Sequence, residues 1–250
     1  MFVDDLFTTA PHHGASLLSA IHPRAYVDLN RAPYELEQVL FEDRLPDHVD
    51  KKSLRASSGL GTVPRQVAEN APIYDGKLTY ADAEQRIENI YRPFHHQIAS
   101  LLQTMQRQYG FAILLDAHSM PSQATRLGRN SLGSQAVDFV IGNRHNKACD
   151  RRLTDWVKTY LQARGYVVVL NQPYAGGYIT EHYGQPAHGC HALQIEINRA
   201  IYMDEDSYQP HDGYARVQEN MSYLMADLIA ELPTLADHLR VDNGDRSAAE

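Results

Sequence analysis

The side chains best suited to chemistry belong to two segments in which acids and a histidine accompany apolar runs. Asp116 and His118 come directly after the apolar run 111–115, and Glu196 lies within the alternating segment 192–197. Histidine is a common metal ligand, an aspartate can orient its ring, and a carboxylate beside a metal can activate water. These residue types suit a metal ligand or a general base. The simpler alternatives are a histidine that caps a turn and a glutamate on a solvated edge strand.

A third segment, 171–184, combines two adjacent glycines with hydrogen-bonding side chains. The pair that ends at Gly177 allows the backbone to approach a ligand closely. Tyr178, Thr180 and His182 follow it and can donate hydrogen bonds. These residues predict a pocket wall, although a tight turn with aromatic packing explains them equally well.

Two arginines could bind the carboxylates of an acidic substrate. Arg31 ends the run 28–31, and Arg65 follows the glycine-containing run 59–64. A guanidinium can pair with a carboxylate through two parallel hydrogen bonds. For Arg31 taken alone, a structural ion pair with Asp28 is the favoured explanation, and the signal at Arg65 is weaker.

Apolar spacing predicts the elements that position these residues. Pro93 should bend or split a helix at 80–109, and the segment that holds Glu196 should be a strand. Alternating strands and helices predict an α/β fold with a mostly parallel or mixed central sheet and helices on both faces. Ligands of such sheets bind beyond the carboxyl ends of the strands. We expect a single domain over 1–240 and a disordered tail over 241–250. The expected strands are 15–20, 25–29, 111–115, 166–170 and 192–197, and the other expected helices are 149–164 and 214–232.

The composition argues against several classes of protein. A net charge of −8 over 250 residues disfavours non-specific nucleic-acid binding, which needs a cationic face. The longest apolar runs are too short to span a bilayer, and the N-terminus has no secretory signal pattern. Two cysteines without a CxxC pair suit a reducing cytoplasm. We expect a cytoplasmic protein without membrane or nucleic-acid partners. The sequence leaves its oligomeric state open.

Several motifs, taken in order, resemble the N-formylglutamate amidohydrolase family. They extend over nearly the whole chain, and the joint agreement of several motifs of four or more residues makes the resemblance specific. The motifs are VDDLF at 3–7, PRAYVDLNRAPYEL at 23–36, GLGTVPR at 59–65, YRPFH at 91–95, LLDAHSMPS at 114–122, VDFVIG at 137–142, NQPYAGGYITEHYG at 171–184 and HALQIEINRAIYMDE at 191–205.

The resemblance implies a fold like that of the zinc-dependent exopeptidases, of the carboxypeptidase kind. It implies hydrolysis of N-formyl-L-glutamate to glutamate and formate, a step of histidine breakdown, with related N-acyl amino acids as further candidate substrates. A divalent metal, expected to be zinc, would be bound by His118. Glu196 would activate the attacking water and then protonate the leaving nitrogen. The other implied positions are Asn30, Arg31 and Arg65 for binding the substrate, Gly177, Tyr178 and Thr180 for the pocket, and Asp116 and His182 in support of the metal site.

One part of the family pattern has no counterpart here. Members usually begin with a strand that carries a motif of proline, histidine, a small residue and glycine. A short acidic motif follows, and the histidine and one acidic residue are the expected metal ligands before the segment that matches 3–7. Met1 falls at or just past this point, and the PHHG sequence at 11–14 comes too late to replace it. A catalytic zinc normally takes three protein ligands, so we expect a missing N-terminal strand segment, weak zinc binding and little activity.

Two alternatives to a complete amidohydrolase of this kind remain open. The chain could be a catalytically impaired, truncated homologue that only binds an acidic ligand or a partner. It could also be a carboxypeptidase-like enzyme or a deacylase of other N-acyl amino acids. A misassigned start site would explain the missing motifs without any loss of function.

Overall fold

The structure, a computed structural model, describes residues 2–68, 71–125 and 136–241. Its chain divides into two compact units. The first comprises Met1–Leu18 and Leu102–Glu250, and the second comprises Ser19–Leu101. The tail that the sequence predicts to be disordered lies, from residue 242 onward, outside the described residues.

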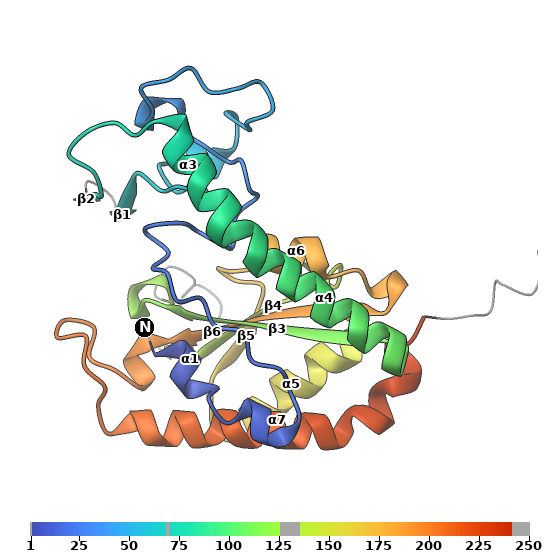
Figure 1. Ribbon diagram of the computed structural model, residues 1–250. Coiled ribbons are helices and arrows are strands. Elements are labelled where there is room, and N and C mark those ends of the chain that lie inside the picture. Colours follow the sequence, from blue (N-terminus) through green and yellow to red (C-terminus); the bar gives the residue numbers. More distant parts are fainter. Residues whose placement is uncertain (1, 69–70, 126–135, 242–250) are drawn as a thin grey trace, which may run out of the picture. The chain divides into compact units, whose positions relative to one another are not determined.

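The first unit is built on a four-stranded mixed sheet (Figure 1). β3 runs parallel to β6, β6 runs antiparallel to β4, and β4 runs parallel to β5. The mixed sheet expected from the sequence is therefore confirmed. In spatial order its strands are β3 (Ala112–Met120), β6 (Cys190–Asn198), β4 (Phe139–Gly142) and β5 (Val168–Leu170).

Within this four-stranded sheet, β4 is the strand that the apolar spacing does not predict. All four of its residues are buried, so they show neither the alternation of a half-buried strand nor the spacing of a helix. β6 lies between β3 and β4, and its own alternation predicts it well. The strand expected at 166–170 is confirmed in its second half, as β5.

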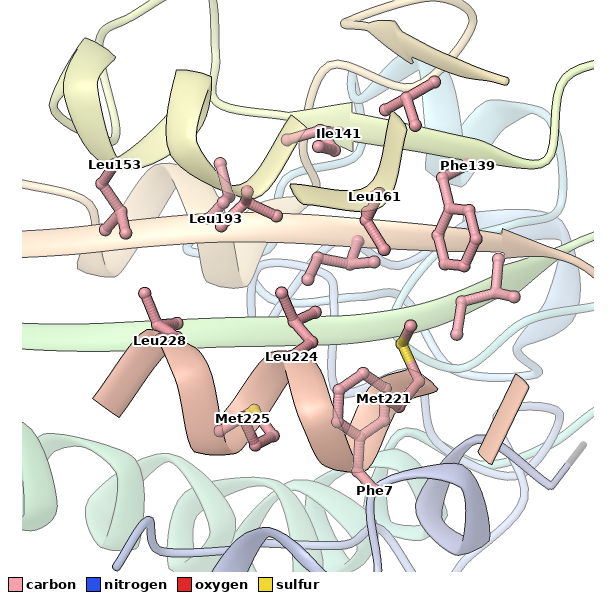
Figure 2. Close-up of a cluster of buried hydrophobic side chains, with 14 of the residues drawn as sticks. Phe7, Phe139, Ile141, Leu153, Leu161, Leu193, Met221, Leu224, Met225 and Leu228 are labelled. Carbon is pink, nitrogen blue, oxygen red and sulfur yellow. The ribbon is translucent and has the colours of Figure 1, made fainter. Parts of the chain in front are cut away.

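One face of this sheet is apolar, and α5 (Arg151–Ala163) and α7 (Gly213–Leu239) cover it (Figure 1). Leu193, Ile195 and Ile197 of β6 are fully buried on this face. Burial of one such side chain stabilises a fold by about 1.5–3 kcal/mol, so this face supplies much of the unit's stability. Figure 2 shows the facing side chains, among them Phe139, Ile141, Leu193, Leu153, Leu161, Met221, Leu224 and Leu228.

Local signals set the ends of α5 and α7. The carboxylate of Asp150 accepts a hydrogen bond from the Arg152 amide at the start of α5, and Gly165, at a φ of +85°, follows its end. The helix expected at 149–164 is thus confirmed. The helix expected at 214–232 is also confirmed, but it continues through Pro233 to Leu239. Of the helices in the described part of the chain, none is long and apolar enough to cross a bilayer.

The opposite face of the sheet packs against α6 (Tyr178–Tyr183) (Figure 1). The sequence predicts a pocket wall or a tight turn here, but not a helix. Six residues are too few for a helical apolar pattern to be recognised, and so short a helix depends on tertiary packing for its stability.

The second unit has long irregular segments and a small core of its own. Leu36, Phe41, Leu45, Val63 and Ala83 are buried together in it. Its elements are η2 (Gln38–Leu40), α2 (Leu54–Ser57), β1 (Gln66–Ala68), β2 (Ala71–Pro72), α3 (Tyr80–Arg86), η3 (Ile87–Tyr91) and the first part of α4 (Arg92–Tyr109).

The helix expected at 80–109 is split near Pro93, as its sequence predicts. α3 passes into the π-helical stretch η3, and α4 begins only at Arg92. Proline has no backbone N–H to donate and its ring crowds the preceding turn, which disfavours a continuous α-helix here. Gly110, at a φ of +81°, then ends α4 as expected.

The prediction of strands at 15–20 and 25–29 is wrong. Neither segment contains a strand, residues 16–21 are exposed, and Tyr26 closes a turn by donating its amide to the Pro23 carbonyl at 2.8 Å. A strand is stabilised mainly by pairing, and no described strand pairs with either segment. The remaining short helices are α1 (Val3–Leu6), η1 (Ala10–His13), η4 (Ser122–Thr125), η5 (Pro186–His188) and η6 (Arg199–Ile201).

Candidate active site

Two polar pairs lie in register across β3 and β6. His118 is the partner of Glu196, and Asp116 is the partner of Gln194. Partners on adjacent parallel strands project from the same face, and the strands lie about 4.8 Å apart. The carboxylate of Glu196 and the imidazole of His118 therefore lie side by side on the face that α6 contacts.

Glu196 is on a central strand, between His118 on one side and Val140 of β4 on the other. It is only 8% exposed. The alternative of a glutamate on a solvated edge strand is therefore wrong.

Asp116 and His118 lie inside β3, not beyond its end as the sequence predicts. β3 continues to Met120 because β6 supplies a pairing partner for each residue as far as Asn198. The polar residues after Leu115 led to the prediction that the strand ends there. Their backbone pairing with β6 keeps them in the strand despite their polarity.

The carboxylate of Asp116 fixes the orientation of the His118 ring. Asp116 Oδ1 lies 2.8 Å from His118 Nε2, so the proton between them is on the Nε2 side of the imidazole. Thr180 Oγ1, fully buried on α6, donates to Asp116 Oδ2 at 3.3 Å. α6 thus supports the aspartate, and the aspartate orients the histidine.

Gln194 is a member of this polar face that the sequence analysis does not single out. Its Nε2 donates to Glu196 Oε1 at 2.9 Å, and its Oε1 accepts the Gly177 amide at 2.7 Å. The available signal was its position two residues before Glu196 on an alternating strand, which places both side chains on one face.

The loop before α6 lies directly on the sheet because Gly142 has no side chain. A Cβ at Gly142 would lie 2.7 Å from the Ala175 carbonyl carbon and 2.7 Å from the Gly176 nitrogen. The Arg144 amide also donates to the Ala175 carbonyl at 2.7 Å. Gly176 has a φ of +121°, a conformation that favours glycine, and this turn directs the Gly177 amide toward Gln194.

Tyr178 and His182 lie one turn apart on α6 and contact each other. Their rings stack at 5.0 Å, and the Tyr178 hydroxyl lies 3.3 Å from His182 Nδ1. Of the predicted pocket residues, Gly177 and Thr180 contact the polar face. The supporting role expected of His182 stays a prediction.

The predicted substrate-binding residues Asn30, Arg31 and Arg65 belong to the second unit, where Asp28 organises the first two. The backbone amide of Asn30 donates to Asp28 Oδ1 at 2.9 Å, and Arg31 Nε lies 3.6 Å from Asp28 Oδ2. Arg31 Nε also donates to the Leu60 carbonyl at 2.8 Å. Burial lowers the pKa of the Arg31 guanidinium from its ordinary value, and the charge of Asp28 opposes that shift.

Arg65 also has an acidic partner. Its Nε lies 2.8 Å from Glu37 Oε2. Both arginines are therefore held by ion pairs within the second unit, as the simpler explanation for Arg31 predicts. A shallow pocket of about 180 Å³ in this unit, lined mainly by Ser19, Ile21, His22, Asn89, Ile90 and Phe94, contains none of the predicted site residues.

The described side chains do not form a complete zinc site. Within the described ranges, no group of three or more His, Cys, Asp or Glu side chains could hold a metal ion. A catalytic zinc normally takes three protein ligands. The PHHG sequence does not add one beside His118, because His13 contacts Ser222 of α7 at 3.1 Å, on the apolar side of the sheet.

Comparisons with known proteins agree over most of the chain. Residues 1–203 match the N-formylglutamate amidohydrolase family. The N-formylglutamate deformylase of Pseudomonas putida is 33% identical over 206 residues, which are 81% of this chain and 70% of that protein. The N-formylglutamate deformylase of Pseudomonas aeruginosa is 32% identical over 205 residues, with the same shares of the two chains.

A solved structure also resembles this fold. The crystal structure of N-formylglutamate amidohydrolase from Ralstonia eutropha JMP134 matches with a TM-score of 0.87 at 31% sequence identity. The match covers 94% of this chain and 83% of that one.

Proposed function

Because the chain belongs to the N-formylglutamate amidohydrolase family, we propose that it hydrolyses the N-formyl amide of N-formyl-L-glutamate. A closely related N-acyl amino acid is the alternative substrate. The reaction adds water across the C–N bond, so the products are formate and the free amino acid. The proposal extends to the architecture of the carboxypeptidase-like zinc exopeptidases, a role in histidine breakdown and a cytoplasmic location.

The observation that supports this reaction best is that Glu196 and His118 lie directly opposite each other on the adjacent strands β6 and β3. In the proposed reaction, Glu196 takes a proton from water while the water oxygen bonds to the formyl carbon. It then gives that proton to the nitrogen as the C–N bond breaks. A buried carboxylate that a hydrogen bond from Gln194 holds in place suits the part of a general base.

We propose a divalent metal, expected to be zinc, with His118 as one ligand and Asp116 as the group that orients its ring. When bound, such a metal would polarise the formyl oxygen. The residues described do not fit a zinc centre by themselves, so the steps given above use only protein groups and water. Zinc content measured by mass spectrometry, before and after incubation with excess zinc, tests this part alone.

The substrate carboxylates need cationic partners, for which we propose Arg31 and Arg65, with Asn30 beside them. Chemistry supports this choice, since a guanidinium matches a carboxylate in geometry and charge. The partly buried side chain of Arg31, 13% exposed, is already oriented by Leu60 and Asp28, which would reduce the entropy lost on binding. Gly177, Tyr178 and Thr180 are proposed to shape the formyl end of the pocket.

Formate release from N-formyl-L-glutamate, with N-acetyl-L-glutamate as a second substrate, tests the proposed function. Glu196→Gln should lower kcat by roughly 10²–10⁴-fold, the contribution of a general base. Glu219→Gln is the matched control, because Glu219 is an exposed residue of α7 that hydrogen-bonds Tyr223. Equal formate release by the unmodified chain and Glu196→Gln would remove Glu196 from the reaction. Binding of N-formyl-L-glutamate without turnover would favour the alternative of a non-catalytic homologue.

A further inference from the structure

Gln194 joins Glu196 to the loop before α6, and the proposed reaction gives it no role. Gln194 is 4% exposed, and both ends of its carboxamide form hydrogen bonds. Because the Gly177 amide can only donate, the oxygen of Gln194 must face it, which leaves the Gln194 nitrogen to donate to Glu196. The orientation of the side chain is therefore fixed by chemistry at both ends.

We infer that Gln194 is a positioning residue that holds the Glu196 carboxylate and couples it to the loop at 175–177. The inference rests on the proposed function, since it assigns a further residue to the same site. A hydrogen bond to a charged acceptor is strong and short, so it restricts the carboxylate to one rotamer. Loss of this bond removes a restraint on the direction in which the Glu196 carboxylate faces.

The coupling makes the carboxylate sensitive to the loop. The loop has little freedom of its own, because its backbone packs on Gly142 and the Ala175 carbonyl accepts the Arg144 amide. Gly177 is also the last residue before α6, whose Thr180 supports Asp116. One short segment thus fixes Glu196 through Gln194 and His118 through Asp116.

Two substitutions of similar length separate the two hydrogen bonds. Gln194→Glu keeps an acceptor for the Gly177 amide, but it loses the donor and places a second carboxylate beside Glu196. Gln194→Met loses both bonds. A residue that only stabilises the loop would lower turnover in Gln194→Met and spare Gln194→Glu, whereas a residue that positions Glu196 would lower it in both.

The experiment measures kcat and KM for formate release together with hydrogen exchange of the Gly177 amide. We expect kcat to fall on the order of 10²-fold in both variants, with KM within about threefold of the unmodified chain, because misplacement of a reacting group acts on the chemical step. Gly177 exchange should accelerate in Gln194→Met and stay slow in Gln194→Glu. Asn220→Ala is the control: it removes the 2.8 Å hydrogen bond that Asn220, on α7, donates to the Tyr166 hydroxyl, and it should change neither measurement.

Each outcome supports or overturns the inference. If kcat of Gln194→Glu stays within about twofold of the unmodified chain, Gln194 does not position Glu196. If the unmodified chain releases no formate, the proposed function fails, and exchange in Glu196→Ala decides the coupling. Faster Gly177 exchange in Glu196→Ala as well as in Gln194→Met supports the coupling, and an unchanged rate in Glu196→Ala overturns it.

Discussion

The two faces of β6 differ in almost every physical respect although they share one backbone. On one face Leu193, Ile195 and Ile197 pack into the core against α5 and α7 (Figure 2). On the other face Gln194 and Glu196 are also buried, but they are held by directed hydrogen bonds.

The comparison shows that one face of β6 stabilises the fold and the other positions polar groups. Apolar burial is non-directional and roughly proportional to area, so the first face stabilises the fold. A buried carboxylate costs free energy unless it is hydrogen-bonded, so the second face adds little net stability while it orients reactive atoms. Substitutions of neighbouring residues on β6 should therefore have opposite consequences.

The largest effect on stability should come from Ile195→Ala. Loss of this fully buried side chain should lower the free energy of unfolding by about 2–5 kcal/mol, through lost burial and the cavity left behind. Turnover per folded molecule should change little. Glu196→Gln, one residue away, should alter stability by less than about 1 kcal/mol while turnover collapses. Urea denaturation measures the free energy of unfolding of both variants. A lower value for Glu196→Gln than for Ile195→Ala would contradict the prediction.

A smaller effect on stability, with an added effect on turnover, is expected from Gly142→Ala. The new Cβ would meet backbone atoms of Ala175 and Gly176 at 2.7 Å, and backbone cannot give way as a side chain can. We expect a loss of about 1–3 kcal/mol and a lower kcat, because the displaced loop would move the Gly177 amide away from Gln194. Gly76→Ala, where nothing lies within 4 Å, is the control. Normal turnover of Gly142→Ala would mean that the loop has no influence on Glu196.

The apolar face could be predicted from the sequence, and much of the polar face could not. The side-chain period of two is intrinsic to a strand, so the alternation around Ile195 reveals both faces of β6. It also places Glu196 beside other polar groups, although the partner strand is not specified. The contacts that organise the site join residues far apart in the chain, 64 positions for Thr180 and Asp116 and 17 for Gly177 and Gln194. No local pattern encodes such pairs.

The same limit explains the errors at strand ends. Leu115 is the last residue of an apolar run, but pairing with β6 extends β3 to Met120. The segment 15–20 has a strand-like composition but no described partner strand, and it remains irregular. Pairing is a tertiary property, and the sequence gives only the tendency to pair. The roles of Arg31 and Arg65 stay predictions, since their ion pairs are equally compatible with a structural function.

A modest effect is expected from Thr180→Val, which removes the hydroxyl that donates to Asp116 with little change in side-chain volume. The bond is long at 3.3 Å, so the loss of stability should be about 0.5–1.5 kcal/mol. Thr180→Ser keeps the hydroxyl and should preserve turnover better than Thr180→Val. Thermal unfolding and formate release of the two variants test whether α6 supports the polar face through this contact. Equal turnover in both variants would show that it does not.

The smallest effect near neutral pH should come from His191, the one polar member of the apolar face of β6. Its Nδ1 accepts the Asp150 amide at 3.1 Å, and its Nε2 donates to the Leu239 carbonyl at 2.9 Å, so the neutral ring satisfies both neighbours. Desolvation by burial lowers its pKa from the ordinary value of 6.5, against opposing effects of the Leu239 carbonyl and Asp150.

Because the folded chain takes up this proton less readily than the unfolded chain, the contribution of His191 to stability is complete above about pH 6.5. It is lost as the pH falls below that value toward the folded-state pKa. Urea denaturation between pH 5 and pH 8 should show this decline, and His191→Gln, which cannot titrate, should weaken it. An equally steep decline in His191→Gln would assign the acid sensitivity to other groups and leave the apolar face without a titrating member.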